Sequence, residues 1–350
     1  MKSWRVANSG AGVWRLESVK TWVKLALILA LSMANETNTR VHIGTCGYAY
    51  PGAPPNGWSG VFYPKGGARR VDELEFYATY FNAVEINSTF YRPASAVMAR
   101  GWVSRTPADF VFTVKAWQKF THAAKLGNGP SDGERWAPVQ RADIERFSEG
   151  VAPLVEGGRL GALLFQFPAG FVYTAVNIDR LETVLSTFEI CPKVVELRHR
   201  SWSDHRDETE ALLVRSRATW AFIDEPKFPT SVKQELAATE ELTYLRLHGR
   251  NSEKWWHHQD AWERYDYLYL GENIRRLAAK LKQLAGTSPQ SRIYAFFNNH
   301  ARGQAVANAL MLQGALLSND QVHAPHSLLE AFPELRRFLD SDRVDEVDLK

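Results

Sequence analysis

The chain has 350 residues, of which 45% are hydrophobic and 23% are charged, with 23 Gly and 16 Pro. This composition is ordinary for a globular protein and excludes collagen-like, coiled-coil and wholly disordered chains. Two Cys are too few for a disulfide framework, so we expect a reducing compartment and a cytoplasmic protein. The net charge of +3 comes from residues 1–34, where basic residues outnumber acidic ones. The rest is close to neutral and gives no support for nucleic-acid binding.

Residues 1–38 precede the regular part of the chain, and we expect a dispensable or targeting extension there. Its apolar run, Leu25–Ala34, is too short for a membrane-spanning helix, which needs about 20 residues. Basic residues before this run and small residues at its end are typical of a signal peptide, which would make the protein exported. Two alternatives stay open: Met33 is the true start, or the segment docks on the body as a helix.

From Thr39 onward, short apolar or β-branched runs recur, each with the length of a buried strand. They lie at 41–46, 83–90, 110–116, 161–167, 194–199, 219–224, 243–249 and 292–299. Apolar residues at helical spacing lie between them, at Val71–Phe81, Ile144–Val155, Ile178–Phe188, Glu208–Ser216, Tyr269–Leu284 and Ala305–Leu317. Eight such units predict an α/β fold, a single (β/α)8 TIM-type barrel over residues 39–320. A C-terminal tail, 321–350, follows and contains a short helix at Ser327–Asp340.

Alternation along the strands predicts a polar layer inside the barrel. A barrel strand points successive side chains inward and outward in turn. This rule turns the following residues inward near the carboxyl ends of the strands: Glu85, Asn87, Lys115, Gln166, Glu196, Arg198, Asp224, Arg246, His248 and Asn298. Barrel interiors normally hold Val, Ile and Leu, and unpaired buried charge is costly, so the layer indicates a functional pocket. The alternative is a structural ion-pair network, because the formal charges of the layer cancel.

Within this layer the residue types suggest roles. The candidate catalytic residues are Glu85, Glu196, Asp224 and His248, with Glu85 or Glu196 as a general base, because a carboxylate beside cations stays charged. The candidate ligand-binding residues are Asn87, Lys115, Gln166, Arg198, Arg246, Asn298 and Asn299, since cations and amides suit phosphate or carboxylate groups. An aromatic rim at Tyr48, Tyr50, Trp58, Phe90, Tyr91 and Trp202 suits a phosphorylated or polyol-like molecule.

The expected ligand is therefore a small anion, and its binding should depend on pH. We expect phosphate or sulfate near Arg246, His248 and Asn299, bound more tightly at pH 6 than at pH 8 as His248 becomes protonated near its usual pKa of about 6.5. No cofactor is predicted. A divalent metal on the carboxylates and His248 stays open as an alternative, as in metal-dependent isomerases and hydrolases, although the nearby arginines oppose a second positive charge.

Whether the protein is an enzyme is left open. The sequence contains no P-loop, G-x-S-x-G, H-E-x-x-H or C-x-x-C motif. A non-catalytic protein that binds a metabolite or a nucleic-acid end fits the same polar layer, since fold does not dictate function. The sequence leaves protein partners unknown and indicates no membrane span.

Several motifs carry a family resemblance. They are TCGY (45–48), GVFYP (60–64), VEINSTFYR (84–92), FTVKA (112–116), LFQFP (164–168), VELRHRSW (195–202), RLHGR (246–250) and FFNNHARGQAVANA (296–309). Together they resemble the domain of unknown function 72, the YecE-like family, over about residues 41–317. The resemblance implies a TIM-type barrel with a polar cavity at the carboxyl end, and it implies no activity. Cys46 and Tyr48 stand where the family usually has Ser and Trp, and Gly52–Gly57 lengthens the first loop.

Overall fold

The computed structural model describes residues 41–66, 71–123, 136–237, 241–289, 291–317, 322–339 and 344–345. The expectations for the extension 1–38 lie outside these residues. Within the described ranges, no helix is both long enough and apolar enough to cross a membrane.

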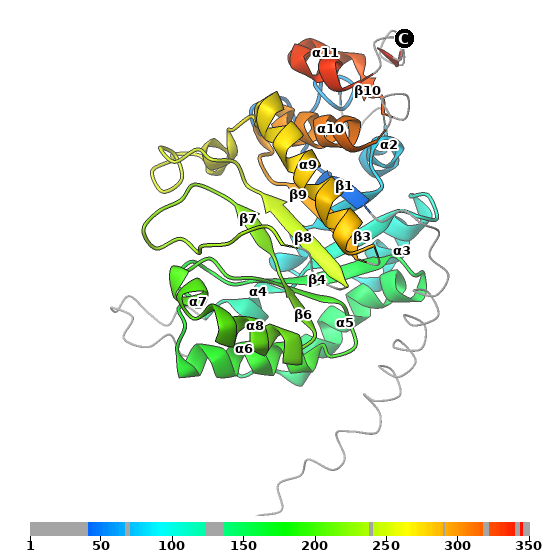
Figure 1. The fold of residues 1–350 in the computed structure, drawn as a ribbon. Coiled ribbons are helices and arrows are strands. Elements are labelled where there is room, and N and C mark those ends of the chain that lie inside the picture. The colour runs from blue at the N-terminus through cyan, green and yellow to red at the C-terminus, as the bar shows by residue number, and fades with distance from the viewer. Residues whose placement is uncertain are drawn as a thin grey trace, which may run out of the picture.

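Parallel strands form two sheets, around which the helices pack (Figure 1). The first has the order β1-β9-β8-β7 and the second the order β2-β3-β4-β5-β6. Their bounds are β1 Val41–Thr45, β2 Ala83–Ile86, β3 Val111–Lys115, β4 Leu160–Gln166, β5 Lys193–Glu196, β6 Ala218–Trp220, β7 Phe222–Asp224, β8 Leu242–Leu247 and β9 Arg292–Phe297. The predicted α/β class with parallel strands is confirmed. The predicted closed barrel is not formed as one hydrogen-bonded ladder, because the described strands pair into two open sheets.

The two sheets meet at two places. Cys46, just past β1, forms an isolated parallel bridge with Glu85 of β2, and the Gly47 N–H donates to the Glu85 carbonyl at 2.8 Å. On the other side, the single strand predicted at 219–224 is two strands, β6 and β7, separated by Ala221. The Ala221 N–H still donates to Val195 of β5, at 2.9 Å. The chain therefore passes from one sheet into the other through a one-residue break.

The helices connect the strands. Their bounds are α2 Glu73–Tyr80, α3 Ala96–Ser104, α4 Gln118–Thr121, α5 Arg141–Glu156, α6 Ala175–Thr187, α7 Arg200–Asp204, α8 Arg206–Arg215, α9 Gly271–Thr287, α10 Gln304–Leu316 and α11 His326–Ala331, with 3-10 turns η2 Ser88–Phe90, η3 Ala261–Tyr265, η4 Ala301–Gly303 and η6 Pro333–Phe338. All six predicted connecting helices are present, whereas α3, α4 and α7 were not predicted. The helix predicted at Ser327–Asp340 is broken into α11 and η6, because Pro333 cannot continue the α-helical hydrogen bonds. A short pair of strands, β10 (Ala324–Pro325) and β11 (Val344–Asp345), completes the C-terminal part.

Side-chain caps define where several helices begin. Asp72 accepts hydrogen bonds from the N–H groups of Leu74 and Glu75 at the start of α2. Ser95 caps α3 by accepting from Met98, and Thr174 caps α6 in the same way. These oxygens satisfy backbone donors that have no partner inside the helix. The polar residue before each of these three helices thus helps to determine its first turn.

The core has two parts, which correspond to the two faces of the strands. The larger part lies between the strands and the helices, and α10 is buried on nearly every side there. The smaller part lies on the opposite strand face and consists of Cys46, Ala83, Ala162, Leu164, Val194, Ala221, Leu242, Tyr244, Tyr294 and Phe296. The polar layer lies on this second face, nearer the carboxyl ends of the strands.

Candidate functional site

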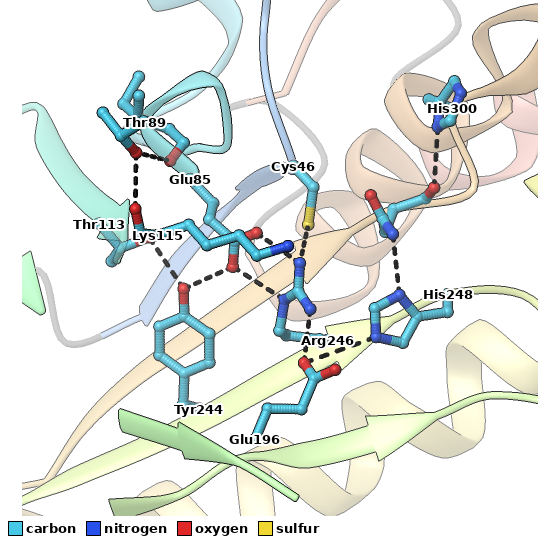
Figure 2. A network of polar contacts seen from close by, with 12 residues as sticks. Cys46, Glu85, Thr89, Thr113, Lys115, Glu196, Tyr244, Arg246, His248 and His300 are labelled. Carbon is cyan, nitrogen blue, oxygen red and sulfur yellow. Dashed lines mark hydrogen bonds and ion pairs between the residues drawn. The ribbon is translucent and has the colours of Figure 1, made fainter. Parts of the chain in front are cut away.

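A buried polar layer lies where the strands end (Figure 2). Glu85 and Glu196 come from β2 and β5, and Arg246 and His248 come from β8 and the residue after its end. None of these four residues is more than 1% exposed. The strand alternation predicted that they would meet, and the structure brings them together.

Arg246 is the centre of this layer. Its Nε and Nη2 atoms donate to the two carboxylate oxygens of Glu85 at 3.0 and 2.7 Å, and its Nη1 donates to Glu196 at 2.5 Å. The Tyr244 hydroxyl donates to Glu85 at 2.7 Å. The two-point contact with Glu85 matches the planar guanidinium to the planar carboxylate, which is the strongest geometry for this pair. Arg246 therefore joins the sheet that contains β2 to the sheet that contains β8.

Arg198 extends the layer toward the solvent. Its Nε donates to the remaining Glu196 oxygen at 2.6 Å, and its Nη1 forms an ion pair with Glu225 at 3.1 Å. The Arg198 side chain is 15% exposed, so it is the more accessible of the two arginines. Glu225 was not predicted as a site residue.

Both central carboxylates are held in the charged form. Burial raises the pKa of Glu85, but the charge and hydrogen bonds of Arg246 outweigh this effect and leave the pKa lowered. Burial also raises the pKa of Glu196, and Arg198 and Arg246 together bring that pKa well below its usual range. Glu225 differs, because burial dominates over the attraction of Arg198 and raises its pKa.

His248 is a neutral imidazole within this layer. Its Nδ1 lies 2.8 Å from the Asn298 amide nitrogen, and its Nε2 lies 3.3 Å from Arg198. Burial, followed by repulsion from Arg198 and Arg246, lowers the pKa of His248 to about 3, although Glu196 acts in the opposite direction. This corrects the prediction that His248 becomes protonated near pH 6.5 and strengthens anion binding at pH 6.

Lys115, the last residue of β3, has a different environment from the arginines. Its Nζ lies 4.1 Å from the centre of the Phe90 ring, and Figure 2 shows it pointing toward Arg246. No residue that the structure describes forms an ion pair or hydrogen bond with this ammonium group. Burial and then repulsion from Arg246 lower the pKa of Lys115 to about 8, against the attraction of Glu196 and Glu85. Lys115 is thus a cation without a counter-ion in the described part of the chain.

Three predicted amides lie around this layer. Asn87 follows β2, and its buried Oδ1 has no hydrogen-bond partner among the described residues. Gln166 ends β4 opposite Glu196 in the strand register. Asn298 contacts His248, as described above.

Asp224 lies outside the network, contrary to the prediction. Its carboxylate binds both nitrogens of the Arg250 side chain, at 2.8 and 2.6 Å. Ala221, between β6 and β7, belongs to the inner part of the core, so strand alternation turns Ile223 and then Glu225 to that face, and Glu225 contacts Arg198. The prediction failed because Phe222 and Ile223 are both apolar, so the pattern does not reveal which face is inside.

Asn299 also points away from the layer. Its amide nitrogen donates to the Tyr267 carbonyl and to Asn308 on α10, at 2.8 and 2.9 Å. Because Asn298 faces inward, strand alternation turns Asn299 toward the helices. The predicted contact between Asn299 and an anion is therefore corrected to a contact that attaches α10 to β9.

The predicted aromatic rim is only partly a rim. Trp58 and Trp202 are fully buried, and their indole N–H groups donate to the carbonyls of His300 and Phe171. Tyr91 is 73% exposed. Phe90 contacts both Lys115 and the ring of His122, whose centre lies 4.9 Å away. The two tryptophans act in packing, and Phe90 is a residue of the predicted rim that contacts the polar layer.

Other kinds of site receive no support from the described residues. Within these residues, no group of three or more His, Cys, Asp or Glu side chains is placed to hold a metal ion. A cavity of about 140 Å³ lies far from the layer, between the start of β1 and helices α9 and α10. A second space, between α5 and α6, holds only about 10 Å³. Neither cavity lies over Arg246.

Comparisons with known proteins agree with this architecture. A protein-family model described as "Protein of unknown function DUF72" matches residues 42–331. The chain is 29% identical over 262 residues to the UPF0759 protein YunF of Bacillus subtilis, covering 72% of this chain and 89% of that protein.

Solved structures give the same result. A DUF72 family protein of Thermotoga maritima matches with a TM-score of 0.65 and 33% identity, over 79% of this chain and 99% of that one. A DUF72 family protein of Enterococcus faecalis matches in fold with a TM-score of 0.66 and 24% identity, over 80% and 97% of the two chains. The match to the family model, over residues 42–331, spans the polar layer, and the chain belongs to the DUF72 family of proteins of unknown function.

Proposed function

We propose that the protein binds a small anionic ligand, phosphorylated or polyol-like, beside the carboxyl ends of its strands. The observation that carries this proposal is the ammonium group of Lys115, which faces the polar layer without a counter-ion among the described residues. Arg246 and Arg198 are already neutralised by Glu85, Glu196 and Glu225. A half-buried cation without a partner is unfavourable, so an anion bound there would lower the free energy of the protein.

The carboxylates have a supporting role in this proposal. Both oxygens of Glu85 accept hydrogen bonds, and each oxygen of Glu196 is held by an arginine. A general base needs a free lone pair that reaches the substrate proton. We therefore assign the two carboxylates to holding Arg246 and Arg198 in position, in preference to general-base chemistry.

We also propose that the two sheets are two parts of one barrel. The Cys46–Glu85 bridge supports this closure on one side, and the one-residue step from β6 to β7 supports it on the other. In such a barrel the polar layer would lie at the end where barrel proteins hold their active sites. The buried, unpaired thiols of Cys46 and Cys191 fit the proposal of a reducing, cytoplasmic location, which cell fractionation would test.

Calorimetric titration with sulfate tests the anion proposal, because the charge of sulfate stays constant over the useful pH range. Above the Lys115 pKa of about 8 the ammonium loses its charge, so sulfate should bind about tenfold or more weakly at pH 9.5 than at pH 6.5. The Lys115→Met variant should lose a similar factor at pH 6.5. The Lys119→Met variant is the matched control, since Lys119 is paired with Asp143 at 2.8 Å.

Two results would overturn the proposal. If the Lys115→Met substitution leaves the sulfate affinity unchanged, Lys115 does not bind the anion and the proposal fails. Mn²⁺ binding that resists mild chelation, in the absence of any sulfate signal, would favour a metal site in its place.

A further inference from the structure

We infer that Lys115 is a carbonyl-binding nucleophile, and that the ligand is a small hydroxyaldehyde or hydroxyketone with an anionic group, which Lys115 binds as an imine. This deepens the proposed function and rests on it for the anionic group.

The position of Lys115 separates it from every other described lysine. Its side chain leaves the carboxyl end of β3 on the inward face, between the end of β2 and the β4 register neighbour Leu164. The ring of Phe90 lies against its ammonium group at 4.1 Å. By contrast, Lys119, one turn further along, is paired with Asp143 and has a side chain that is 53% exposed.

The surroundings of Lys115 favour its neutral amine form over its charged ammonium form. The carboxylates of Glu85 and Glu196 would be its natural counter-ions, but they are bound to Arg246 and Arg198. The same arginines repel the ammonium group, and burial removes part of its hydration. A lysine that only had to hold an anion would gain from a strong ion pair. A desolvated lysine beside other cations has the environment of an amine nucleophile.

The fraction of Lys115 in the neutral, nucleophilic form can be compared with that of an ordinary lysine. With a pKa of about 8, the neutral amine is roughly 200-fold more abundant at pH 7 than for a lysine with a pKa of about 10.4. The charged and titratable groups that interact with Lys115 are Glu85 from β2, Glu196 from β5 and Arg198 after it, Arg246 from β8, and His122 after α4.

Two polar groups, one after β2 and one after α4, fit the remaining needs of the reaction. The buried Oδ1 of Asn87 lacks a donor among the described residues, and a hydroxyl group of the ligand would supply one. His122 contacts the same Phe90 ring, and its Nδ1 lies 3.0 Å from the Thr121 hydroxyl. Burial and the charges of Lys115 and Arg198 lower the pKa of His122 to about 4, so it is a neutral proton acceptor at pH 7. Arg198, whose side chain is 15% exposed, is a second partly exposed cation of this layer.

The chemical step balances without any other reactant. The lone pair of the neutral Nζ forms a bond to the carbonyl carbon, and the carbonyl oxygen takes a proton while the nitrogen returns one to His122 or water. The resulting hydroxyl group takes a second proton, from protonated His122 or from water, and leaves as water while the nitrogen lone pair forms the C=N bond of a protonated imine. This imine then returns its remaining N–H proton to His122 or water, so that no proton is gained or lost overall. One amine and one carbonyl give one imine and one water, and nothing is oxidised or reduced.

The test is reductive trapping of the full-length protein with D-glyceraldehyde 3-phosphate and sodium cyanoborohydride at pH 7, followed by peptide mass spectrometry. Cyanoborohydride transfers hydride to the imine carbon and leaves a stable secondary amine. We expect labelling of Lys115 at least about tenfold faster than labelling of Lys119, given the larger share of neutral amine. The variant Lys115→Arg should lose this label, and Lys119→Arg should keep it. Glyceraldehyde without the phosphate should label Lys115 more slowly.

The outcomes separate this inference from the proposed function. Selective labelling of Lys115 that sulfate suppresses supports both. Sulfate binding without selective labelling overturns the nucleophile and leaves anion binding in place. Selective labelling that sulfate does not affect supports the nucleophile and overturns the anion site. If Lys115→Arg fails to fold, selective labelling of the wild-type protein, read peptide by peptide, still decides the question.

Discussion

At the residue scale, Arg246 connects two buried carboxylates. It is only 1% exposed, and it binds Glu85 and Glu196 at the same time. In a buried pair, the attraction and the cost of desolvation nearly cancel, so the pair adds little over apolar packing. Loss of one partner, however, leaves the other charge uncompensated.

The variant Arg246→Met should therefore lose about 3–5 kcal/mol of unfolding free energy, measured by urea titration at pH 7. The deficit should shrink as the pH falls, because the carboxylates, whose pKa values Arg246 lowers, become protonated and neutral in the variant. Adding Glu85→Gln to the variant should restore part of the loss. Arg105→Met, which breaks a half-exposed pair with Asp72, is the control and should cost less than about 1 kcal/mol. A similar loss in both variants would contradict the buried pairing.

His248 gives a second prediction at this scale. The unfolded chain takes up a proton at this position near pH 6.5, whereas the folded protein, with a His248 pKa of about 3, does not. Stability from the neutral ring is present above pH 6.5 and is lost as the pH falls toward 3. From pH 6.5 to pH 5, the wild type should lose about 2 kcal/mol more unfolding free energy than His248→Asn. An equal loss in the two proteins would show that His248 is protonated in the folded state.

At the scale of the elements, close packing makes two helical glycines unequal. Gly314 of α10 faces the backbone of Phe338 in η6, and a Cβ atom there would clash with the Phe338 carbonyl. Gly286 of α9 has no atom within 4 Å of the position where its Cβ would lie. The first glycine permits contact between two elements, and the second has no such role.

Gly314→Ala should consequently destabilise the protein and release η6 from α10. Thermal unfolding should occur at a lower temperature, and residues 322–339 should become more sensitive to limited proteolysis. Gly286→Ala is the matched control and should raise the unfolding free energy by up to about 1 kcal/mol, since alanine favours the helix. If Gly314→Ala leaves the stability unchanged, η6 shifts to accommodate the added methyl group without loss of unfolding free energy.

Sequence reasoning succeeded for elements with a clear pattern and failed where the pattern was ambiguous. The buried strands were predicted because runs such as 161–167 are apolar and have the length of a strand. Helix α3 was missed because Gly101 and the β-branched residues of AVMARGWVS weaken its helical signal. Glu225 was missed because the break at Ala221 is a matter of tertiary geometry. Asn299 was misplaced although alternation from Asn298 carried the signal.

At the scale of the whole molecule, the contact between β1 and β2 determines whether the two sheets act as one unit. Gly44 of β1 lies against the carbonyl of Ala83 in β2, and a Cβ atom would not fit between them. The bridge from Cys46 to Glu85 lies two residues further along. A seam of this kind depends on backbone atoms approaching closely.

Gly44→Ala should open this seam. Hydrogen exchange of the Gly47 amide, which is bonded to Glu85, should speed up more than exchange in the β3–β4 ladder, where the Ala116 amide donates to Leu164. Equal acceleration at both amides would show global unfolding and no separate seam. Unchanged exchange at Gly47 would contradict a contact between the two sheets at this position.

The order of contacts along the chain has a kinetic consequence for Arg246. It lies 161 residues from Glu85 and 50 residues from Glu196, so its ion pairs close long loops. Closing such a loop costs conformational entropy before the contact contributes any favourable energy, so these contacts form late in folding. Arg246→Met should hence change the folding rate little and raise the unfolding rate, which stopped-flow measurements over a range of urea concentrations would show. The ion pairs of the polar layer would then slow the unfolding of the native protein with little effect on its folding rate.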